Sequence, residues 1–233
     1  MEDVYPIGIN STFNKWGTPC NTTYGDCGCD NCAGNVQDVS ARLDALAQYE
    51  DWRGLWPKTK AHNPQTFHGE GYWSRNPSDE ELVAMNALSF HHGAKLIAAW
   101  VWPFTDSLGK PMGSFGATVS TSPVRDFIVK GQPRRLDLVA ANGQAAPPLV
   151  DVACWVGEHG DKLLVSVVNG GYNALDAPIF IALPDAMVVK KPETVVWGNG
   201  SWSWTRDKRF GNHGLLTLRG QTGMATNMII VDV

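Results

Sequence analysis

The sequence has little of what binding to nucleic acids or insertion into membranes requires. Its 19 Lys and Arg residues are outnumbered by 23 Asp and Glu residues, for a net charge of −4, and the pI is near 5.8. Because there is no basic excess to neutralise phosphates, nucleic acid is not an expected partner. No run approaches the ~20 consecutive apolar residues of a membrane-spanning helix, so we expect no membrane insertion. With 43% apolar and 18% charged residues, the 233-residue chain has the composition of a globular protein.

Several enzyme motifs are absent as well. The chain has no G-x-S-x-G nucleophile elbow, no G-x-x-x-x-G-K-[ST] phosphate loop, no H-E-x-x-H zinc motif and no G-x-G-x-x-G after a strand. We therefore expect no nucleotide, no metal and no other cofactor.

Cysteine is scarce outside one short stretch. Of the five cysteines, Cys154 stands alone in an apolar run, and four lie close together: Cys20, Cys27, Cys29 and Cys32. Their C-x6-C-x-C-x2-C spacing lacks the paired C-x2-C knuckles of common zinc sites. We expect two local disulfides with the pairing left open, and a four-thiolate zinc site is the alternative.

Three N-glycosylation sequons point to the same compartment. They begin at Asn10, Asn21 and Asn199, and the first two lie in or beside the cysteine-rich stretch. Disulfides and glycans together predict a secreted, extracellular glycoprotein. No secretory leader is visible, so a leader of such a protein would lie outside this chain.

Residues 1–131 predict alternating strands and helices with a Cys-rich loop at 18–34. Strands are expected at the start of the chain and at 64–69 and 95–102, and helices at 36–52, from Ser78 to Gly93, and at 122–130. This alternation predicts a parallel sheet with helical crossovers. Three strands are too few for a (β/α)8 barrel, which needs eight, so we expect an α/β partial barrel segment, the C-terminal portion of such a barrel.

The rest of the chain changes character. Residues 132–149 are rich in Pro, Gln and Ala and are expected to be a linker. From residue 150 to 233 short apolar runs alternate with Gly- and Asn-rich turns, which predicts an all-β antiparallel sandwich. Its strands are expected at 150–156, 163–169, 178–183, 194–197, 215–218 and 228–233.

The stretch Phe67-His68-Gly69-Glu70-Gly71-Tyr72-Trp73 carries the clearest chemical signal. Glu70 stands between two glycines, which permit close approach by a ligand, and Tyr72 and Trp73 follow at once. A carboxylate can attack or stabilise an anomeric carbon, and aromatic rings can stack on a pyranose. A glycan or oligosaccharide is therefore the expected ligand, and glycoside hydrolysis is the expected chemistry.

With this motif in place, nearly the whole chain resembles the C-terminal part of a fungal-type retaining glycoside hydrolase of clan A, a (β/α)8 or TIM barrel with an appended β-sandwich. Phe67–Trp73 is similar to the end of barrel strand seven, where the family has its nucleophilic glutamate. Asp3-Val4-Tyr5-Pro6 is similar to the segment after a late strand, and Ala99-Trp100-Val101-Trp102-Pro103 to strand eight.

The resemblance implies a role for each of these residues. Glu70 would be the nucleophile, and Tyr5 would donate a hydrogen bond to it. Trp102, or alternatively Trp100, would stack under the sugar, and Trp73 would line the wall of the cleft. The implied activity is retaining hydrolysis of a β-linked glycan.

The sequence departs from the family in one respect. Retaining chemistry needs a second carboxyl group about 5–5.5 Å from the nucleophile, and the family supplies it from an Asn-Glu pair after strand four, which this chain lacks. Activity would therefore need barrel strands from a second chain or a self-dimer. The alternative is a non-catalytic, lectin-like or otherwise bioactive fragment of such an enzyme.

Overall fold

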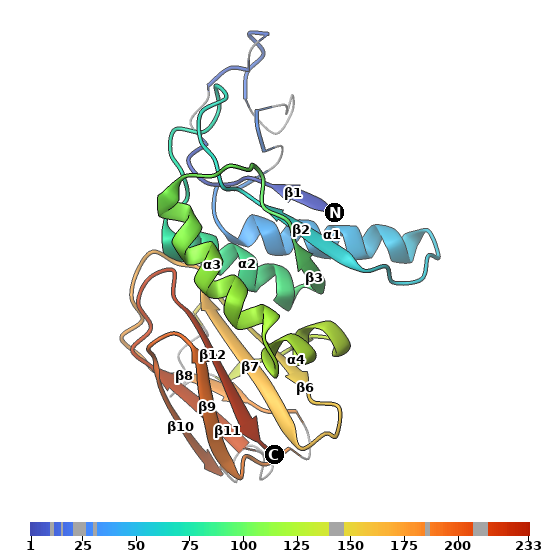
Figure 1. Cartoon of the computed structure of the whole chain (residues 1–233), viewed down its shortest axis with the longest axis vertical. Helices are drawn as coiled ribbons and strands as arrows, with labels where there is room; N and C mark the ends of the chain where they lie inside the picture. Colours follow the sequence, from blue (N-terminus) through green and yellow to red (C-terminus); the bar gives the residue numbers. More distant parts are fainter. Residues whose placement is uncertain are drawn as a thin grey trace. The chain divides into compact units, whose positions relative to one another are not determined.

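The computed structural model divides the chain into two compact units, Met1–Phe115 and Gly116–Val233. It describes residues 1–9, 12–14, 16–20, 27–29, 32–139, 147–184, 187–206 and 214–233. The first unit is mixed α/β and the second consists mainly of antiparallel β-sheet (Figure 1). Among the described helices, none combines the length and apolar character needed to cross a bilayer.

The N-terminal unit is built on a small parallel sheet with strand order β1-β2-β3. Its elements are β1 (Glu2–Val4), α1 (Gln37–Trp52), β2 (Lys60–Pro64), α2 (Asp79–His91), β3 (Ala94–Ile97) and the start of α3 (Asp106–Ser120). Strand–helix–strand connections of this kind are what the alternating pattern predicts. The first and third expected strands overlap β1 and β3, whereas the second, expected at 64–69, forms earlier, at Lys60–Pro64.

Local side-chain hydrogen bonds begin both crossover helices. The Asp38 carboxylate accepts hydrogen bonds from the backbone N–H groups of residues 33 to 35 just before α1. At α2, the Ser78 hydroxyl accepts from the Glu81 N–H, and the Glu81 carboxylate accepts from the Ser78 N–H, so the predicted capping box is confirmed. Arg75 adds two hydrogen bonds to the same buried carboxylate, at 2.6 and 2.7 Å.

The strand boundaries differ from the sequence predictions. β2 spans Lys60–Pro64, so the segment leading directly to Glu70 lies beyond the strand. β3 ends at Ile97, and Leu96 is 56% exposed rather than buried on both faces. Apolar composition alone does not distinguish an edge strand from a central one, because burial depends on which neighbours pair with it.

α3 was not predicted. It contains Pro111 and several glycines, which have low helix propensity. Leu108, Pro111 and Phe115 are nevertheless buried along one side, and tertiary packing of such an apolar face outweighs propensity. The expected helix at 122–130 is confirmed as α4 (Val124–Lys130).

The C-terminal unit contains two antiparallel sheets, with strand orders β4-β6-β7-β12-β9 and β10-β11-β8-β5. Its strands are β4 (Arg134–Arg135), β5 (Leu138–Val139), β6 (Val150–Val156), β7 (Lys162–Asn169), β8 (Ile179–Ala182), β9 (Lys191–Trp197), β10 (Ser201–Arg206), β11 (Gly214–Arg219) and β12 (Thr226–Asp232). All six predicted strands are present. The additional strands are β4 and β5, which lie in the stretch 132–149, and β10.

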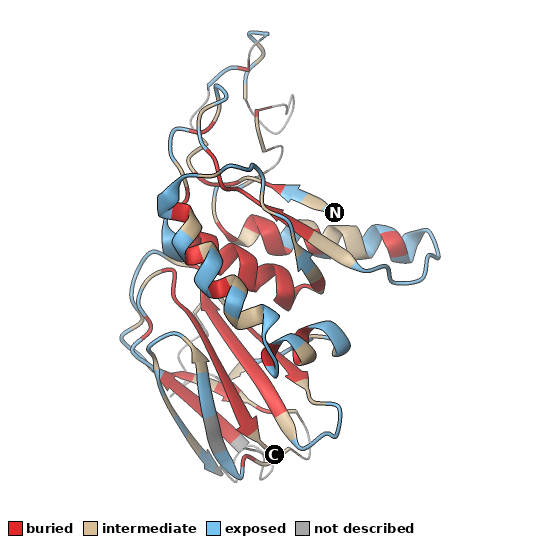
Figure 2. Cartoon of the chain, viewed as in Figure 1, coloured by how far each residue is buried: buried red, intermediate tan, exposed pale blue. Residues whose placement is uncertain are grey.

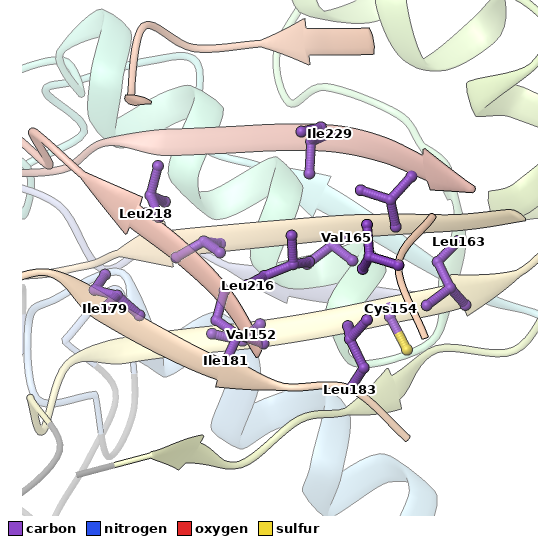
Figure 3. Close-up of a cluster of buried hydrophobic side chains, with 13 residues drawn as sticks. Val152, Cys154, Leu163, Val165, Ile179, Ile181, Leu183, Leu216, Leu218 and Ile229 are labelled. Atoms are coloured by element: carbon purple, nitrogen blue, oxygen red, sulfur yellow. The ribbon is translucent and has the colours of Figure 1, made fainter. Parts of the chain in front are cut away.

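Apolar side chains from both sheets form the core of this unit. In Figure 3, Cys154, Val165 and Ile229 from one sheet and Leu216 from the other lie in a common cluster. β7 and β12 are buried along most of their lengths (Figure 2). Trp202 and Trp204 of β10 pack partly against this core. The expected apolar sandwich core is therefore present.

Candidate functional site

The candidate site lies at the carboxyl edge of the parallel sheet. Val4 of β1 and Pro64 of β2 face each other in the register, so both strands end at the same level. Tyr5 and Gln65 follow them directly. Three residues beyond the end of β3, the Trp100 N–H donates to the Pro64 carbonyl at 3.1 Å. Three segments that are distant in sequence therefore leave the sheet together, at the edge where parallel α/β sheets bind ligands.

Gln65 joins the first two of these segments. Its side chain is fully buried, its Oε1 accepts from the Ile7 N–H at 2.9 Å, and its Nε2 donates to the Ile7 and Phe67 carbonyls. The amide thus replaces the backbone pairing that ends at Val4. Gln65 could not be selected from the sequence, because nothing local indicates that its partner lies 58 residues away.

Thr66 joins the second and third segments. Its N–H and its hydroxyl both donate to the Trp100 carbonyl, at 2.7 and 2.6 Å. The Trp100 backbone is therefore held beside the segment that leads to Glu70. The peptide bonds Trp100–Val101 and Trp102–Pro103 are cis.

Glu70 stands at the tip of a tight turn. The φ angles of Gly69, Glu70 and Gly71 are 93°, 51° and 83°. The turn is closed by hydrogen bonds between Gly69 and Trp73, with the Gly69 N–H donating at 2.6 Å and the Trp73 N–H at 3.0 Å. No neighbour lies within 4 Å of a Cβ placed at either glycine. The glycines are thus required for backbone conformation rather than for space, and the Glu70 side chain is exposed.

An aromatic cluster supports this turn. The Trp73 ring packs edge-to-face against Tyr5, Phe67 and Tyr72, with centroids 6.0, 4.8 and 5.8 Å away. Its Nε1–H donates to the Tyr5 carbonyl at 2.7 Å. Because Trp73 is 7% exposed, it holds the turn in place and presents little ring surface to a ligand.

Burial and nearby negative charges both act on the Tyr5 hydroxyl. Burial raises the pKa of the Tyr5 hydroxyl well above its usual value, and the nearby negative charges of Asp3 and Glu70 raise it further. The hydroxyl therefore stays protonated and can donate a hydrogen bond over the whole physiological range. Asp3 lies on β1, two positions before Tyr5, and was not among the acids predicted from the sequence.

The cysteine-rich stretch packs onto this cluster. Its four cysteines form two disulfides, Cys20–Cys27 and Cys29–Cys32, in agreement with the expectation of two local bridges. A Cβ placed at Gly28 would lie 2.9 Å from the Tyr72 Cβ and 2.8 Å from the Trp73 ring. The disulfides thus hold a glycine backbone directly against the two aromatic residues that follow Glu70.

The indoles of the third segment are exposed. Trp100 is 47% and Trp102 76% exposed, and the Trp102 ring packs edge-to-face against Phe104 at 4.9 Å. Of the proposed stacking residues, these two therefore have the most ring surface available to a ligand.

Among the sequon residues, Asn199 is exposed in the turn between β9 and β10. Gly198, with a φ of 84°, and Gly200 both approach the buried Asn227 there, whose Oδ1 accepts from the Gly200 N–H at 2.8 Å. The other two sequon residues, Asn10 and Asn21, lie outside the described residues. Glycosylation at all three remains a prediction.

Comparisons with known proteins identify glycoside hydrolases among solved structures. No family model and no curated protein sequence matches the chain. An α-L-arabinofuranosidase from Thermotoga maritima in complex with arabinose has a TM-score of 0.44 at 13% identity, over 99% of this chain and 52% of that one. A debranching enzyme from Nostoc punctiforme soaked with acarbose has a TM-score of 0.40 at 12% identity, over 82% and 38%. A family 51 α-L-arabinofuranosidase from Bifidobacterium longum has a TM-score of 0.41 at 9% identity, over 99% and 52%. The chain spans about half or less of the length of these proteins.

Proposed function

We propose that the chain is the C-terminal part of a clan A glycoside hydrolase that acts on a β-linked glycan by a retaining mechanism, with Glu70 as the nucleophile. One observation carries the proposal: Val4 of β1 and Pro64 of β2 pair, so that Tyr5 and the segment that leads to Glu70 leave the parallel sheet at the same edge. The negative charge of Glu70 also contributes to the raised pKa of Tyr5. A protonated tyrosine beside a carboxylate can orient it for attack at an anomeric carbon and stabilise its charge. Trp100 and Trp102 would provide the sugar-stacking surface.

The proposal includes a second component that completes the barrel. β1 and β3 each pair only with β2 among the described strands, so each has an outer edge without a strand partner there. Exposed strand edges bind further strands readily. We propose that additional barrel strands, from a second chain or a second copy, cover these edges and supply the acid/base carboxylate. The two disulfides favour an extracellular location, and the glycosylation sites would belong to the same secreted protein.

The experiment uses substrates whose leaving group needs no acid. A 2,4-dinitrophenyl β-glycoside can form a glycosyl-enzyme without protonation of its leaving group, so the nucleophile is tested apart from the missing acid/base. We expect a burst of dinitrophenolate from a panel of such glycosides, and a matching adduct on Glu70 in the intact and peptide masses. Added azide should restore turnover by attacking the adduct.

The controls are two glutamine variants. Glu70→Gln should abolish the burst and the adduct. Glu158→Gln, at an exposed glutamate of the C-terminal unit paired with Lys130, should leave both unchanged. A burst that persists in Glu70→Gln, or an adduct on another residue, would rule out Glu70 as the nucleophile.

The second candidate function is non-catalytic glycan binding. The exposure of Trp100 and Trp102 favours it, because stacking on a sugar needs no second carboxylate. Binding to a glycan array that Trp102→Ala removes, without any dinitrophenolate burst, would support this candidate over the hydrolase.

A further inference from the structure

A second group of exposed aromatic side chains lies at the opposite end of β2 from Glu70. Tyr49, Trp52, Leu55 and Trp56, here called the aromatic patch, are 58, 68, 37 and 73% exposed. They occupy the end of α1 and the connection that leads into β2 at Lys60, whereas Glu70 follows the other end of that strand. Figure 2 shows the end of α1 and this connection as largely exposed. Exposed apolar groups gathered in this way mark interaction sites.

The rings of the aromatic patch are held by local contacts. Tyr49 and Trp52 pack edge-to-face, with centroids 5.4 Å apart, and the Lys58 Nζ lies 5.9 Å from the Trp56 centroid. Below them, the Lys60 Nζ donates to the Glu50 carboxylate at 2.9 Å. Such contacts restrict the rings before a ligand arrives, which lowers the entropic cost of binding.

A hollow of about 560 Å³ adjoins the aromatic patch. Met1, Leu46, Tyr49 and Leu55 contribute its apolar surface, and Arg53, Lys58 and Lys60 contribute hydrogen-bond donors. The volume falls in the range of about 300–1,000 Å³ that small-molecule sites occupy. Flat rings beside such a hollow fit a ligand with apolar faces and many hydroxyl groups.

The local charges indicate that this ligand is uncharged. Three cations, Arg53, Lys58 and Lys60, stand among two carboxylates, Glu50 and Asp51, so the excess is a single positive charge. Attraction to an anionic lipid surface typically takes a cluster of about four to eight basic residues. Charges of both signs instead provide donors and acceptors for hydroxyl groups, while the rings stack on the C–H faces of a sugar.

We propose that the aromatic patch is a binding site for an uncharged polysaccharide, separate from the Glu70 site and independent of its activity. Trp52 and Trp56 would stack on successive sugars, and the hollow would hold a neighbouring unit. A site of this kind would keep the protein on a polymer whether or not Glu70 cleaves it.

The test is affinity electrophoresis of the full chain in gels that contain soluble β-1,3-glucan, mixed-linkage β-glucan, arabinoxylan or galactomannan. All variants carry Glu70→Gln, so the gel polymer is not cut by the proposed nucleophile. We expect retardation by at least one polymer, and binding about tenfold or more weaker in Trp52→Ala and in Trp56→Ala, which corresponds to about 1.4 kcal/mol. Binding should change little between 0.1 and 0.5 M NaCl, because stacking is not screened by salt.

The control is Trp16→Ala, which removes an indole of similar exposure, 64%, from another part of the same unit. It should bind like the parent, and Trp52→Phe should retain part of the affinity because a ring remains. Thermal melts of all variants should agree, since the substituted side chains are exposed. Because Trp100 and Trp102 are intact in Trp52→Ala and Trp56→Ala, weaker binding by these two variants separates this site from the proposed stacking residues beside Glu70.

Four outcomes would overturn the proposal. The first is no retardation by any of the four polymers, and the second is equal retardation of the parent and both alanine variants. The third is an absence of glycan binding together with binding to phosphatidylcholine/phosphatidylserine vesicles that Trp52→Ala removes. The fourth is a dimer in analytical ultracentrifugation that Trp56→Ala dissociates. The last two would assign the aromatic patch to a membrane surface and to a second copy of the chain.

Discussion

Strand β7 of the C-terminal unit buries mainly Leu and Val, whereas strand β2 of the N-terminal unit buries polar side chains. The C-terminal unit is centred on an apolar cluster in which strands of both sheets contribute Val, Leu and Ile. In the N-terminal unit, the central strand β2 and the residue after it bury His62, Asn63 and Gln65, each less than 5% exposed. Burial of polar groups is costly unless they are hydrogen-bonded, and Gln65 shows what such burial accomplishes. It holds the segments that carry Tyr5 and Phe67 in one arrangement. The comparison suggests that the second unit contributes mainly stability and the first positions chemical groups.

The largest expected effect tests the apolar core of the C-terminal unit. Leu216→Ala removes a fully buried side chain from the sandwich, and we expect the free energy of unfolding to fall by about 2–5 kcal/mol. Leu96→Ala is the matched substitution in the N-terminal unit. Since Leu96 is 56% exposed, we expect a change within about 0.5 kcal/mol. Urea unfolding followed by tryptophan fluorescence measures both, and equal losses would contradict the comparison.

The next effect concerns the pH dependence of the free energy of unfolding. We assign its decrease at acid pH to a group in the N-terminal unit and its decrease at alkaline pH to a group in the C-terminal unit. Burial lowers the pKa of His62 to about 4, against a slight opposing effect of the Glu2 backbone. Between about pH 6.5 and 4, the unfolded chain therefore takes up a proton at His62 while the folded chain does not. The free energy of unfolding falls by about 3 kcal/mol as the pH decreases over this window.

In the C-terminal unit, burial raises the pKa of Cys154 to about 11. The unfolded chain loses that proton first, so stability falls as the pH rises from about 9 to 11.

Two variants separate these limits. Compared with the parent in urea titrations at several pH values, His62→Gln should flatten the acid side of the stability profile. Cys154→Ala should flatten the alkaline side only, although it lowers stability throughout by leaving a small cavity. An acid loss that is unchanged in His62→Gln would contradict the assignment of this limit to His62.

The smallest effect compares the two described non-glycine residues with positive φ, Glu70 at 51° and Met224 at 53°. Asn adopts this conformation more readily than most residues. Because the Glu70 side chain is exposed, Glu70→Asn should raise the free energy of unfolding by roughly 0.5 kcal/mol and remove the proposed nucleophile. Met224 is 4% exposed, so Met224→Asn should destabilise the fold through lost burial. Thermal melts of both variants measure these changes in stability. A lower stability of Glu70→Asn than of the parent would show that the carboxylate makes a contact that stabilises the turn.

Local signals in the sequence were sufficient for much of the secondary structure. The capping box at Ser78 and Glu81 predicted the start of α2 correctly. It could be recognised from the sequence because its hydrogen bonds join residues only three positions apart. The sandwich strands followed from short apolar runs between turn signals. The helix α3 and the end of β3 at Ile97 could not be predicted in this way, since the first depends on tertiary burial of an unfavourable sequence and the second on which strands pair with it.

The candidate site was predictable only in part. The sequence singled out Glu70 between two glycines, but it predicted a strand leading directly to this residue rather than the positive-φ turn found there. Trp102 is exposed, as a stacking residue requires. The burial of Trp73 was not visible, because it depends on Tyr5 and Gly28, 68 and 45 positions away along the chain.

By itself, the sequence determined where most helices and strands form and which carboxylate stands at a glycine turn, because capping, alternation and glycine conformation act over a few residues. The tertiary structure alone decided that Tyr5, Gln65 and Trp100 meet at the edge of the sheet beside that turn. Gln65 contacts Ile7 and Trp100, which are 58 and 35 positions away, and the pairing of parallel strands brings such positions together without leaving a local mark in the sequence.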